Sequence, residues 1–375
     1  MSAHRLERLL AASAFAALAL LAGCASRGKP DPQPLEALTP KITATVAWTQ
    51  RVDGVQFPLA IAVTRGMFTV AGNDGTVMAL EADTGREVWR GNAGAKLSAG
   101  VGSDGRFAAV VTRDGELVVF EQGQVKWRKA LGSRVTTAPL VAGERVFVLG
   151  VDRTVQAFDA IDGRKLWALQ RPGDPLTLAQ SGVLSPFKNT LVVGQGARMA
   201  GVDPLLGTVK WDVAVGSPRG ANEIERLADL VGPSRRLGDT VCARSFQAAV
   251  GCVDAERGAS VWSKNVGGTD AIGGDAEFIF AGDASDRVNA WKSGNGDVAW
   301  TSDKLLFRGL SAPASFNKSV VFGDENGTVH WLARDTGEAQ LRLTTDGGAI
   351  TVQPVVLGST MLVVTRKGGL FAFRQ

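Results

Sequence analysis

The chain has 375 residues, of which 45% are hydrophobic and 21% charged, and its formal net charge at pH 7 is +4. A charge this small, interspersed along the chain, gives no basis for nucleic-acid binding. The length alone suggests two domains, although closed β architectures often exceed that expectation. No apolar run approaches 18 residues beyond the N-terminus, so no other segment is expected to cross a membrane.

Residues 1–23 are predicted to be a signal peptide. Two arginines precede an almost wholly apolar run at 9–22, which is too short to span a bilayer. The run ends in Leu-Ala-Gly-Cys, residues 21–24, which resembles the bacterial lipobox; that resemblance implies cleavage before Cys24 and lipid on its thiol and amino group. Because Ala25 follows instead of Asp, the expected location is the outer membrane, lipid-anchored on its periplasmic side. An ordinary secretory signal with a chance cysteine is the alternative.

A polar tether is predicted between the lipid and the folded domain. Residues 24–41 contain four prolines, at positions 30, 32, 34 and 40. Such a segment extends by about 3.1 Å per residue where it is polyproline-like. We therefore expect a signal peptide at 1–23, a lipid-anchored tether at 24–41 and a folded domain at 42–375.

One spacing recurs along the folded domain, a glycine followed four residues later by tryptophan. The copies are Gly85/Trp89, Gly123/Trp127, Gly163/Trp167, Gly207/Trp211, Gly258/Trp262 and Gly296/Trp300, with Gly337/Leu341 as a variant and Trp48 as an additional mark. Successive marks lie 41, 38, 40, 44, 51, 38 and 41 residues apart. A period of this length is typical of four-stranded propeller blades.

The residues within each period indicate antiparallel strands. Short β-branched and aromatic runs, such as 146–150 and 154–158, are separated by Asp/Gly turns. The repeated tryptophan is expected on the outer strand, packed between neighbouring blades, because a single blade cannot bury both of its faces. The sequence thus predicts an all-β, eight-bladed β-propeller of four-stranded antiparallel blades.

The two ends of the domain are predicted to complete one blade together. The final run, 362–373, supplies two strands and stops before any Gly-x-x-x-Trp copy, whereas 45–48 offers an additional strand at the N-terminus. Pairing this N-terminal strand with the last blade would close the ring and remove both sheet edges.

Two cysteines remain once Cys24 is assigned to lipid. Cys242 and Cys252 lie on strand-like runs that read as one hairpin. The periplasm is oxidising, so a cross-strand disulfide is possible. Two buried free thiols are equally compatible with the sequence, and a redox-active Cys-x-x-Cys pair is absent.

Departures from the repeat indicate where function is located. The two longest periods are consecutive, 44 residues after Trp167 and 51 after Trp211, and both insertions precede the next blade's first strand. Such connections emerge on one propeller face, so we expect the segments 172–180 and 221–229 to be neighbours.

The composition of these segments is that of a protein-binding patch. Leu176 and Leu178 have alternating spacing and would project to one side of an extended loop. The second segment places Glu223, Arg226 and Asp229 among apolar residues, and apolar anchors rimmed by charge are typical of interfaces. Alternatively, the leucines could pack onto their own blades.

The lipobox, the tether, the eight repeats and the two loops together resemble the BamB family, propeller lipoproteins of the β-barrel assembly machinery. The segment Asn-Glu-Ile-Glu-Arg-Leu-Ala-Asp at 222–229 is similar to the family's Glu-Ile-Asp-Arg-Leu-x-Asp, and Leu-Thr-Leu at 176–178 is similar to its Leu-x-Leu. The chain departs from the family at Ala179, where Arg is frequent, and at Val231, where a second Asp is frequent. These two contacts are therefore not expected.

The resemblance implies a non-catalytic scaffold that binds the periplasmic POTRA domains of BamA. Through BamA it would join the rest of the assembly (BAM) complex and assist the folding and insertion of β-barrel outer-membrane proteins. By the same resemblance, Leu176, Leu178, Glu223, Arg226 and Asp229 are the expected partner-binding residues. Leu176, Leu178 and Asp229 would contact BamA, and holding the loop is the alternative role of Glu223 and Arg226. Unfolded outer-membrane clients are further possible partners, by strand addition to exposed edges.

Two other functions compete with this scaffold. A quinoprotein dehydrogenase shares the propeller but uses PQQ, calcium and typically an adjacent-cysteine disulfide, and no two cysteines are adjacent here. His330 is the single histidine after the signal peptide, which excludes a His-zinc cluster and leaves one candidate base for a catalytic triad. Because it precedes Trp331 in a strand-like run, we interpret it as a packed strand residue. No catalytic residue, metal or cofactor is expected; a generic periplasmic ligand-binding propeller stays open.

Overall fold

The computed structural model describes residues 30–173, 176–218 and 220–375. The predicted signal peptide and Cys24, the predicted site of lipid attachment, lie outside these residues. Contacts divide the chain into a unit of Met1–Pro32 and a second unit of Gln33–Gln375, and the following description concerns the second unit. None of the described residues belongs to a helix long and apolar enough to cross a membrane.

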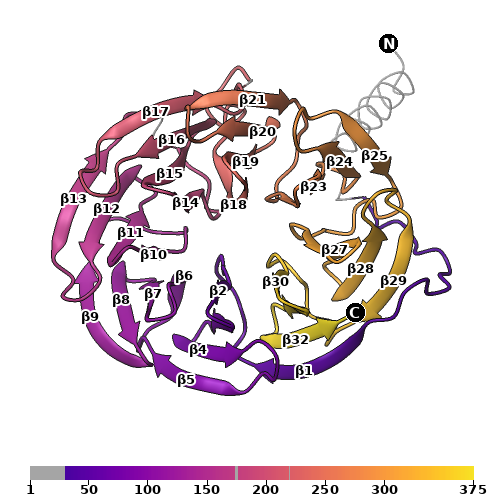
Figure 1. The fold of residues 1–375 in the computed structure, drawn as a ribbon, viewed down its shortest axis with the longest axis horizontal. Coiled ribbons are helices and arrows are strands. Elements are labelled where there is room, and N and C mark those ends of the chain that lie inside the picture. Colours follow the sequence, from indigo (N-terminus) through magenta and orange to yellow (C-terminus); the bar gives the residue numbers. More distant parts are fainter. Residues whose placement is uncertain (1–29, 174–175, 219) are drawn as a thin grey trace, which may run out of the picture. The chain divides into compact units, whose positions relative to one another are not determined.

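Eight four-stranded antiparallel sheets form the blades of a ring (Figure 1). From the centre outwards, the first four blades contain β2 (Ala62–Thr64), β3 (Met67–Ala71), β4 (Thr76–Glu81) and β5 (Glu87–Asn92); β6 (Leu97–Ser103), β7 (Phe107–Thr112), β8 (Glu116–Glu121) and β9 (Gln124–Ala130); β10 (Leu140–Ala142), β11 (Arg145–Leu149), β12 (Thr154–Asp159) and β13 (Lys165–Gln170); and β14 (Leu184–Phe187), β15 (Thr190–Gln195), β16 (Arg198–Val202) and β17 (Val209–Ala214).

The second half of the ring repeats this order. Blades 5 to 8 contain β18 (Leu230–Leu237), β19 (Thr240–Ser245), β20 (Ala249–Asp254) and β21 (Ala259–Lys264); β22 (Gly273–Gly274), β23 (Phe278–Gly282), β24 (Val288–Lys292) and β25 (Val298–Ser302); β26 (Ala314–Phe316), β27 (Ser319–Gly323), β28 (Thr328–Ala333) and β29 (Ala339–Thr344); and β30 (Val355–Leu357), β31 (Thr360–Val364), β32 (Gly369–Arg374) and β1 (Thr45–Arg51). The predicted fold is confirmed.

The N-terminal strand completes blade 8 as predicted. Strand β1 pairs antiparallel with β32, from Thr45 opposite Arg374 to Arg51 opposite Gly369. The expectation that closure removes the sheet edges is wrong. Each blade is a separate sheet, so the outermost strand of every blade, β1 included, has a hydrogen-bonded partner on one side only among the described residues.

The repeated tryptophans join neighbouring blades through a defined contact. Each tryptophan of the repeat, and Leu341 in the variant copy, lies on the outermost strand of its blade. A Cβ added to Gly85 would lie 2.5 Å from the ring of Trp48, because the indole of one blade rests on the turn of the next. The indole nitrogen of Trp48 donates to the carbonyl of Ala82 at 2.9 Å, three residues before that glycine. Equivalent bonds run from Trp127 to Ala160, Trp167 to Pro204, Trp262 to Ser293 and Trp300 to Arg334.

The turn glycines are required by backbone conformation as well as by space. Gly85 has φ of 69° and Gly337 has φ of 72°, in the left-handed region that side chains disfavour. A Cβ at Gly337 would lie 2.4 Å from the ring of Trp300. The Gly-x-x-x-Trp spacing therefore combines two requirements: a glycine that accepts a neighbour's indole and a tryptophan that reaches the following blade.

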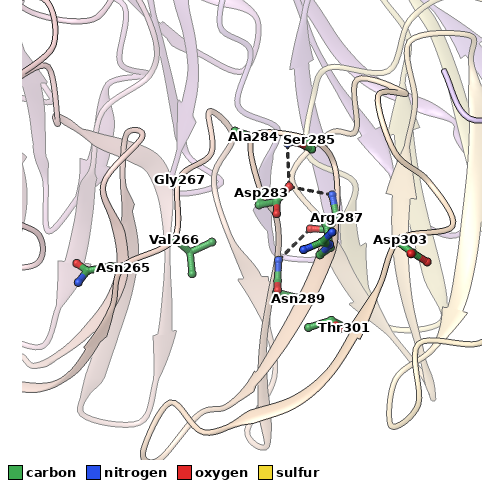
Figure 2. Close-up of a pocket in the computed structure, with 10 residues that line it drawn as sticks. All are labelled: Asn265, Val266, Gly267, Asp283, Ala284, Ser285, Arg287, Asn289, Thr301 and Asp303. Atoms are coloured by element: carbon green, nitrogen blue, oxygen red, sulfur yellow. Dashed lines mark hydrogen bonds between the residues drawn. The ribbon is translucent and has the colours of Figure 1, made fainter. Parts of the chain in front are cut away.

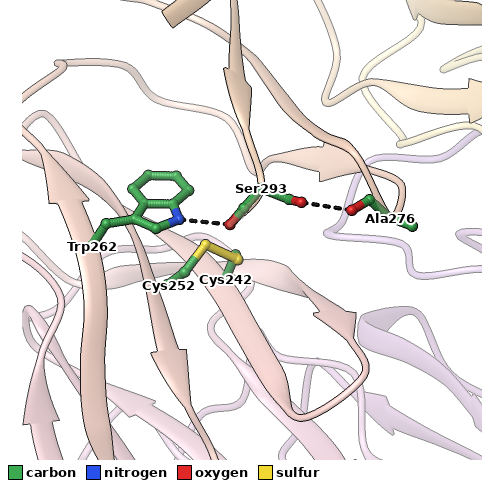
Figure 3. The surroundings of a disulfide bond; sticks show 5 residues. All are labelled: Cys242, Cys252, Trp262, Ala276 and Ser293. Carbon is green, nitrogen blue, oxygen red and sulfur yellow. Dashed lines mark hydrogen bonds between the residues drawn. A yellow bond between two sulfur atoms is a disulfide. The ribbon is translucent and has the colours of Figure 1, made fainter. Parts of the chain in front are cut away.

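The two cysteines are joined in the hairpin of β19 and β20 (Figure 3). Cys242 and Cys252 are directly opposed in the register of these strands, and their sulfur atoms are bonded. Both are buried beside Trp262, whose indole nitrogen donates to the carbonyl of Ser293 in blade 6 at 2.7 Å. The disulfide thus lies under the contact between blades 5 and 6.

The last nine residues of the predicted tether contact blade 7 and the connection that leads to it from blade 6. Residues 33–41 contain no helix or strand. The amide of Gln33 donates to the carbonyl of Leu306 at 2.9 Å, and that of Lys41 donates to Gln340 at 2.8 Å. The side chain of Leu35 packs against the hydrophobic cluster between blades 6 and 7. The domain boundary at residue 42 stays a prediction.

Candidate functional site

The described parts of the two long loops lie together on one side of the ring. The carboxylate of Asp229 accepts a hydrogen bond from the backbone N–H of Leu178 at 2.9 Å, across 51 residues of sequence. Its other oxygen lies 3.9 Å from a guanidinium nitrogen of Arg153, in the turn between β11 and β12. One carboxylate therefore joins both loops to blade 3. We call the described residues of 172–180 and 221–229 the paired loops.

The second of the paired loops is organised by its own side chains. The side chain of Asn222 accepts a hydrogen bond from the backbone N–H of Glu225 at 2.9 Å. Glu225 in turn accepts from the N–H of Ala221 at 2.8 Å. This reciprocal arrangement resembles a helical capping box, in which two otherwise unsatisfied donors are bonded. It forms a single tight turn and leaves Ile224 74% exposed.

The C-terminal half of the first of the paired loops is held by two hydrogen bonds. The hydroxyl of Thr177 donates to the carbonyl of Val151 at 3.2 Å, and that of Thr136 donates to Gln180 at 2.9 Å. Leu176 is 38% exposed, whereas Leu178 is half-buried and packs against a small apolar cluster that includes Val231, Ala271 and Ala312. The two leucines therefore differ in exposure, and Leu176 is the outward one.

The contacts in the structure differ from the roles that the family resemblance implied for the loop residues. Glu223 and Arg226, which were expected to bind the partner or, alternatively, to hold the loop, have exposed side chains. Asp229, expected as a contact residue, is half-buried and holds the two loops together. The sequence analysis assigned no separate role to Glu225, although Asn222-x-x-Glu225 has the spacing of a capping box. It also passed over Arg153, for which the sequence offered no signal.

The paired loops stand beside the central channel. This cavity has a volume of about 1020 Å³ and is lined by the innermost strands of the blades. Its lining includes residues 179–182, which contain the end of the first loop, and residues 231–235, which come shortly after the second loop. The side-chain amide of Gln353 donates to the carbonyls of Ile272 at 3.1 Å and Pro313 at 2.6 Å, which ties blade 8 to blades 6 and 7.

A second hollow of about 610 Å³ lies between blades 5 and 6 and is lined mainly by polar residues (Figure 2). Its carboxylate Asp283 accepts hydrogen bonds from the backbone N–H groups of Ser285 at 2.8 Å and Arg287 at 3.0 Å. The carboxylate is thus engaged in shaping a turn. In the part of the chain that the structure describes, no group of three or more His, Cys, Asp and Glu residues could hold a metal ion.

His330 lies on β28 and belongs to a buried ionic cluster. This position agrees with its interpretation as a packed strand residue. Its Nε2 is 3.0 Å from an oxygen of Asp324. The same oxygen accepts two bonds from the guanidinium of Arg308, at 2.9 and 2.8 Å. Burial lowers the pKa of His330 below its usual value, although Asp324 opposes this shift.

Comparison with known proteins identifies the family. Residues 73–302 match the family described as "Outer membrane protein assembly factor BamB". A protein of that name from Bordetella pertussis is 34% identical over 95% of each chain. The crystal structure of BamB from Moraxella catarrhalis superimposes with a TM-score of 0.80, covering 89% of this chain and all of the other, at 23% identity.

The propeller itself is shared more widely. A quinohemoprotein alcohol dehydrogenase from Comamonas testosteroni superimposes with a TM-score of 0.67 at 14% identity, covering 88% of this chain and 76% of the other. At that identity the likeness concerns the fold alone. The family match and the Bordetella relative, in contrast, extend over most of the sequence. The chain belongs to the BamB family of outer membrane protein assembly factors.

Proposed function

We propose that this protein is a non-catalytic subunit of the outer-membrane β-barrel assembly complex, lipid-anchored through Cys24 on the periplasmic side. Its paired loops would bind the periplasmic POTRA domains of BamA and so assist the folding and insertion of outer-membrane proteins. Family membership supports the assembly role. The predicted signal peptide and the lipobox pattern support the location.

One observation supports the paired loops as the docking surface. Two consecutive insertions, the longest in the repeat, are joined through Asp229 and present Leu176 and Ile224 to solvent. The capping contacts of Glu225 hold the second loop before any partner arrives. A preorganised loop loses less conformational entropy on binding, so exposed apolar anchors on it contribute more to affinity.

The decisive variant changes the outward apolar residues and leaves the internal contacts intact. We expect Leu176→Asp combined with Ile224→Asp to reduce recovery of BamA in a pull-down from solubilised envelopes. Loss of a hot-spot anchor costs about 2 kcal/mol or more, which corresponds to roughly a thirtyfold weaker complex. Asp229 is left unchanged because its substitution would also disturb the loops themselves.

A matched control shows whether a loss of BamA binding is specific to the paired loops or follows from any new surface charge. Leu206 is 70% exposed in the turn between β16 and β17, away from the paired loops. Leu206→Asp changes the same chemistry at a similar exposure and should recover BamA like the unmodified protein. Wild-type recovery by the double variant, or an equal loss with Leu206→Asp, would refute the assignment of the paired loops.

A further inference from the structure

The contacts of residues 33–41 with blade 7 involve the backbone at both ends. The N–H of Gln33 donates to Leu306 and its carbonyl accepts from Arg308 at 3.1 Å. At the other end the N–H of Lys41 donates to Gln340. Between them the carbonyl of Glu36 accepts from Arg342 at 3.2 Å. We call this segment the strap.

Side chains add a second layer of contact. Leu35 is partly buried against the cluster that contains Trp300 and Leu310. Two ion pairs accompany it, Lys304 with Glu36 at 2.7 Å and Lys41 with Glu338 at 2.8 Å. Exposed pairs of this kind contribute little to the stability of the folded state, because water and salt screen the charges. Attachment of the strap therefore depends mainly on its backbone bonds and on Leu35.

The buried ionic cluster supplies one of these contacts from a charged donor. The guanidinium of Arg308 is buried and directs two of its nitrogens at Asp324, which is itself fully buried. Because the guanidinium is planar and rigid, these two bonds to one carboxylate oxygen restrict where its third nitrogen points. The third nitrogen, Nη1, bonds the carbonyl of Gln33. The cluster thus holds a donor in place for the strap.

The strap lies across the ring from much of the docking surface. Blade 7 carries the strap, whereas the paired loops connect blade 3 to blade 4 and blade 4 to blade 5. In Figure 1, β13 and β17 lie on the opposite side of the ring from β28 and β29. A segment that leaves the propeller at the strap therefore leaves it far from the first of the paired loops.

We infer that the strap fixes the point at which the lipid-bearing segment leaves the propeller, so that the rim of blade 7 is the membrane-proximal edge. This inference rests on the proposed lipid at Cys24. Whatever conformation the intervening residues adopt, Cys24 is nine residues from Gln33, at most about 32 Å along an extended chain. A domain of this size is roughly 50 Å across, so the anchor reaches the rim of blade 7 more readily than the opposite rim.

The strap itself is tested by hydrogen exchange on the full-length lipoprotein. The amides of Gln33 and Lys41 should be protected, and Leu35→Asp should remove that protection while the amides of the blades stay protected. Arg308→Lys, which keeps the charge beside Asp324 but loses the planar fork, should lower protection at Gln33. Lys304→Gln is the matched control and should change little. Exchange as fast as in an unfolded peptide in the unmodified protein would overturn the inference.

The orientation is tested with lipids that quench fluorescence. A thiol-reactive dye is placed at Thr336→Cys in blade 7 or at Asp162→Cys, the equivalent exposed turn position of blade 3. In vesicles that contain nitroxide lipids, the lipidated protein should be quenched more at position 336 than at 162, and Leu35→Asp should reduce this difference. Equal quenching at both positions of the anchored protein would overturn the orientation.

Membrane fractionation distinguishes that result from failure of the anchor. The unmodified protein should sediment with membranes, and Cys24→Ser should release it. A protein that is soluble in both forms would refute the lipid anchor and the orientation together. Equal quenching of a membrane-bound protein would refute the orientation and leave the anchor standing.

Discussion

The carboxylate of Asp324 is buried among donors from three directions. Burial alone would raise its pKa, but hydrogen bonds from His330, from the N–H of Thr328 and from Arg308 outweigh this effect and lower the pKa to about 2. The unfolded chain would protonate the same carboxyl near its ordinary value of 3.8. Its contribution to stability is therefore complete above about pH 4 and is lost as the pH falls towards 2.

His330 makes stability depend on pH in a higher range. Because burial lowers its pKa, the unfolded state takes up a proton below about pH 6.5 before the folded state does. Acidification from pH 7.5 to 5 should therefore decrease the free energy of unfolding measured in urea. His330→Gln, which removes the group that titrates, should flatten this part of the profile. An unchanged slope in that variant would show that other groups dominate.

The contact between indole and turn can be tested at Trp300, which is 9% exposed. Trp300→Ala should lower the free energy of unfolding by about 3–5 kcal/mol, since it removes a large buried ring and its bond to Arg334. Gly337→Ala should also destabilise, because a Cβ there meets the same ring. Urea denaturation of the two variants checks this, and a loss below about 1 kcal/mol in both would contradict the role assigned to the contact.

One residue departs from the repeat for a reason visible in the structure. Leu341 stands where the other outer strands have tryptophan. The following blade is the one completed by the two chain ends, so β32 and β1 are not joined by a turn. No glycine turn exists there to receive an indole, and Leu341 packs instead with Trp331 and Phe373. The sequence shows that leucine replaces tryptophan here, but only the arrangement of the blades explains why.

At the scale of strands and loops, the hairpin of β19 and β20 is closed by a covalent bond. Reduction, or the double change of Cys242 and Cys252 to alanine, should lower the free energy of unfolding by about 2–3 kcal/mol, as expected for a short loop. A thiol assay in denaturant should detect no free thiol from this pair before reduction. Two reactive thiols in the oxidised, unlipidated protein would contradict the bond.

The paired loops show what the spacing of the repeat can predict and what it cannot. Their common face followed from the repeat, because connections of one type emerge on one side of a propeller. The roles of their residues did not follow, since Asp229 meets Leu178 across 51 residues and Arg153 comes from a third segment. Contacts of this kind depend on the final folding of each loop, which has no periodic signal.

At the scale of the whole molecule, period and turn chemistry were sufficient to predict the number of blades and the closure by β1. The strap could not be predicted in the same way. Its prolines and polar residues indicate an extended segment, and its partners, such as Leu306 and Gln340, lie about 300 residues further along the chain. A contact between segments so far apart in the sequence leaves no local pattern in either segment.

The ladder between β1 and β32 also sets an order of events during biogenesis. A chain exported from its N-terminus delivers Thr45–Arg51 first and Gly369–Arg374 last. The first strand to arrive in the periplasm must therefore stay unpaired until translocation is complete. Seven consecutive blades can form in turn, but the ring is sealed only by the final residues, so a chain shortened at its C-terminus would leave both of its ends open.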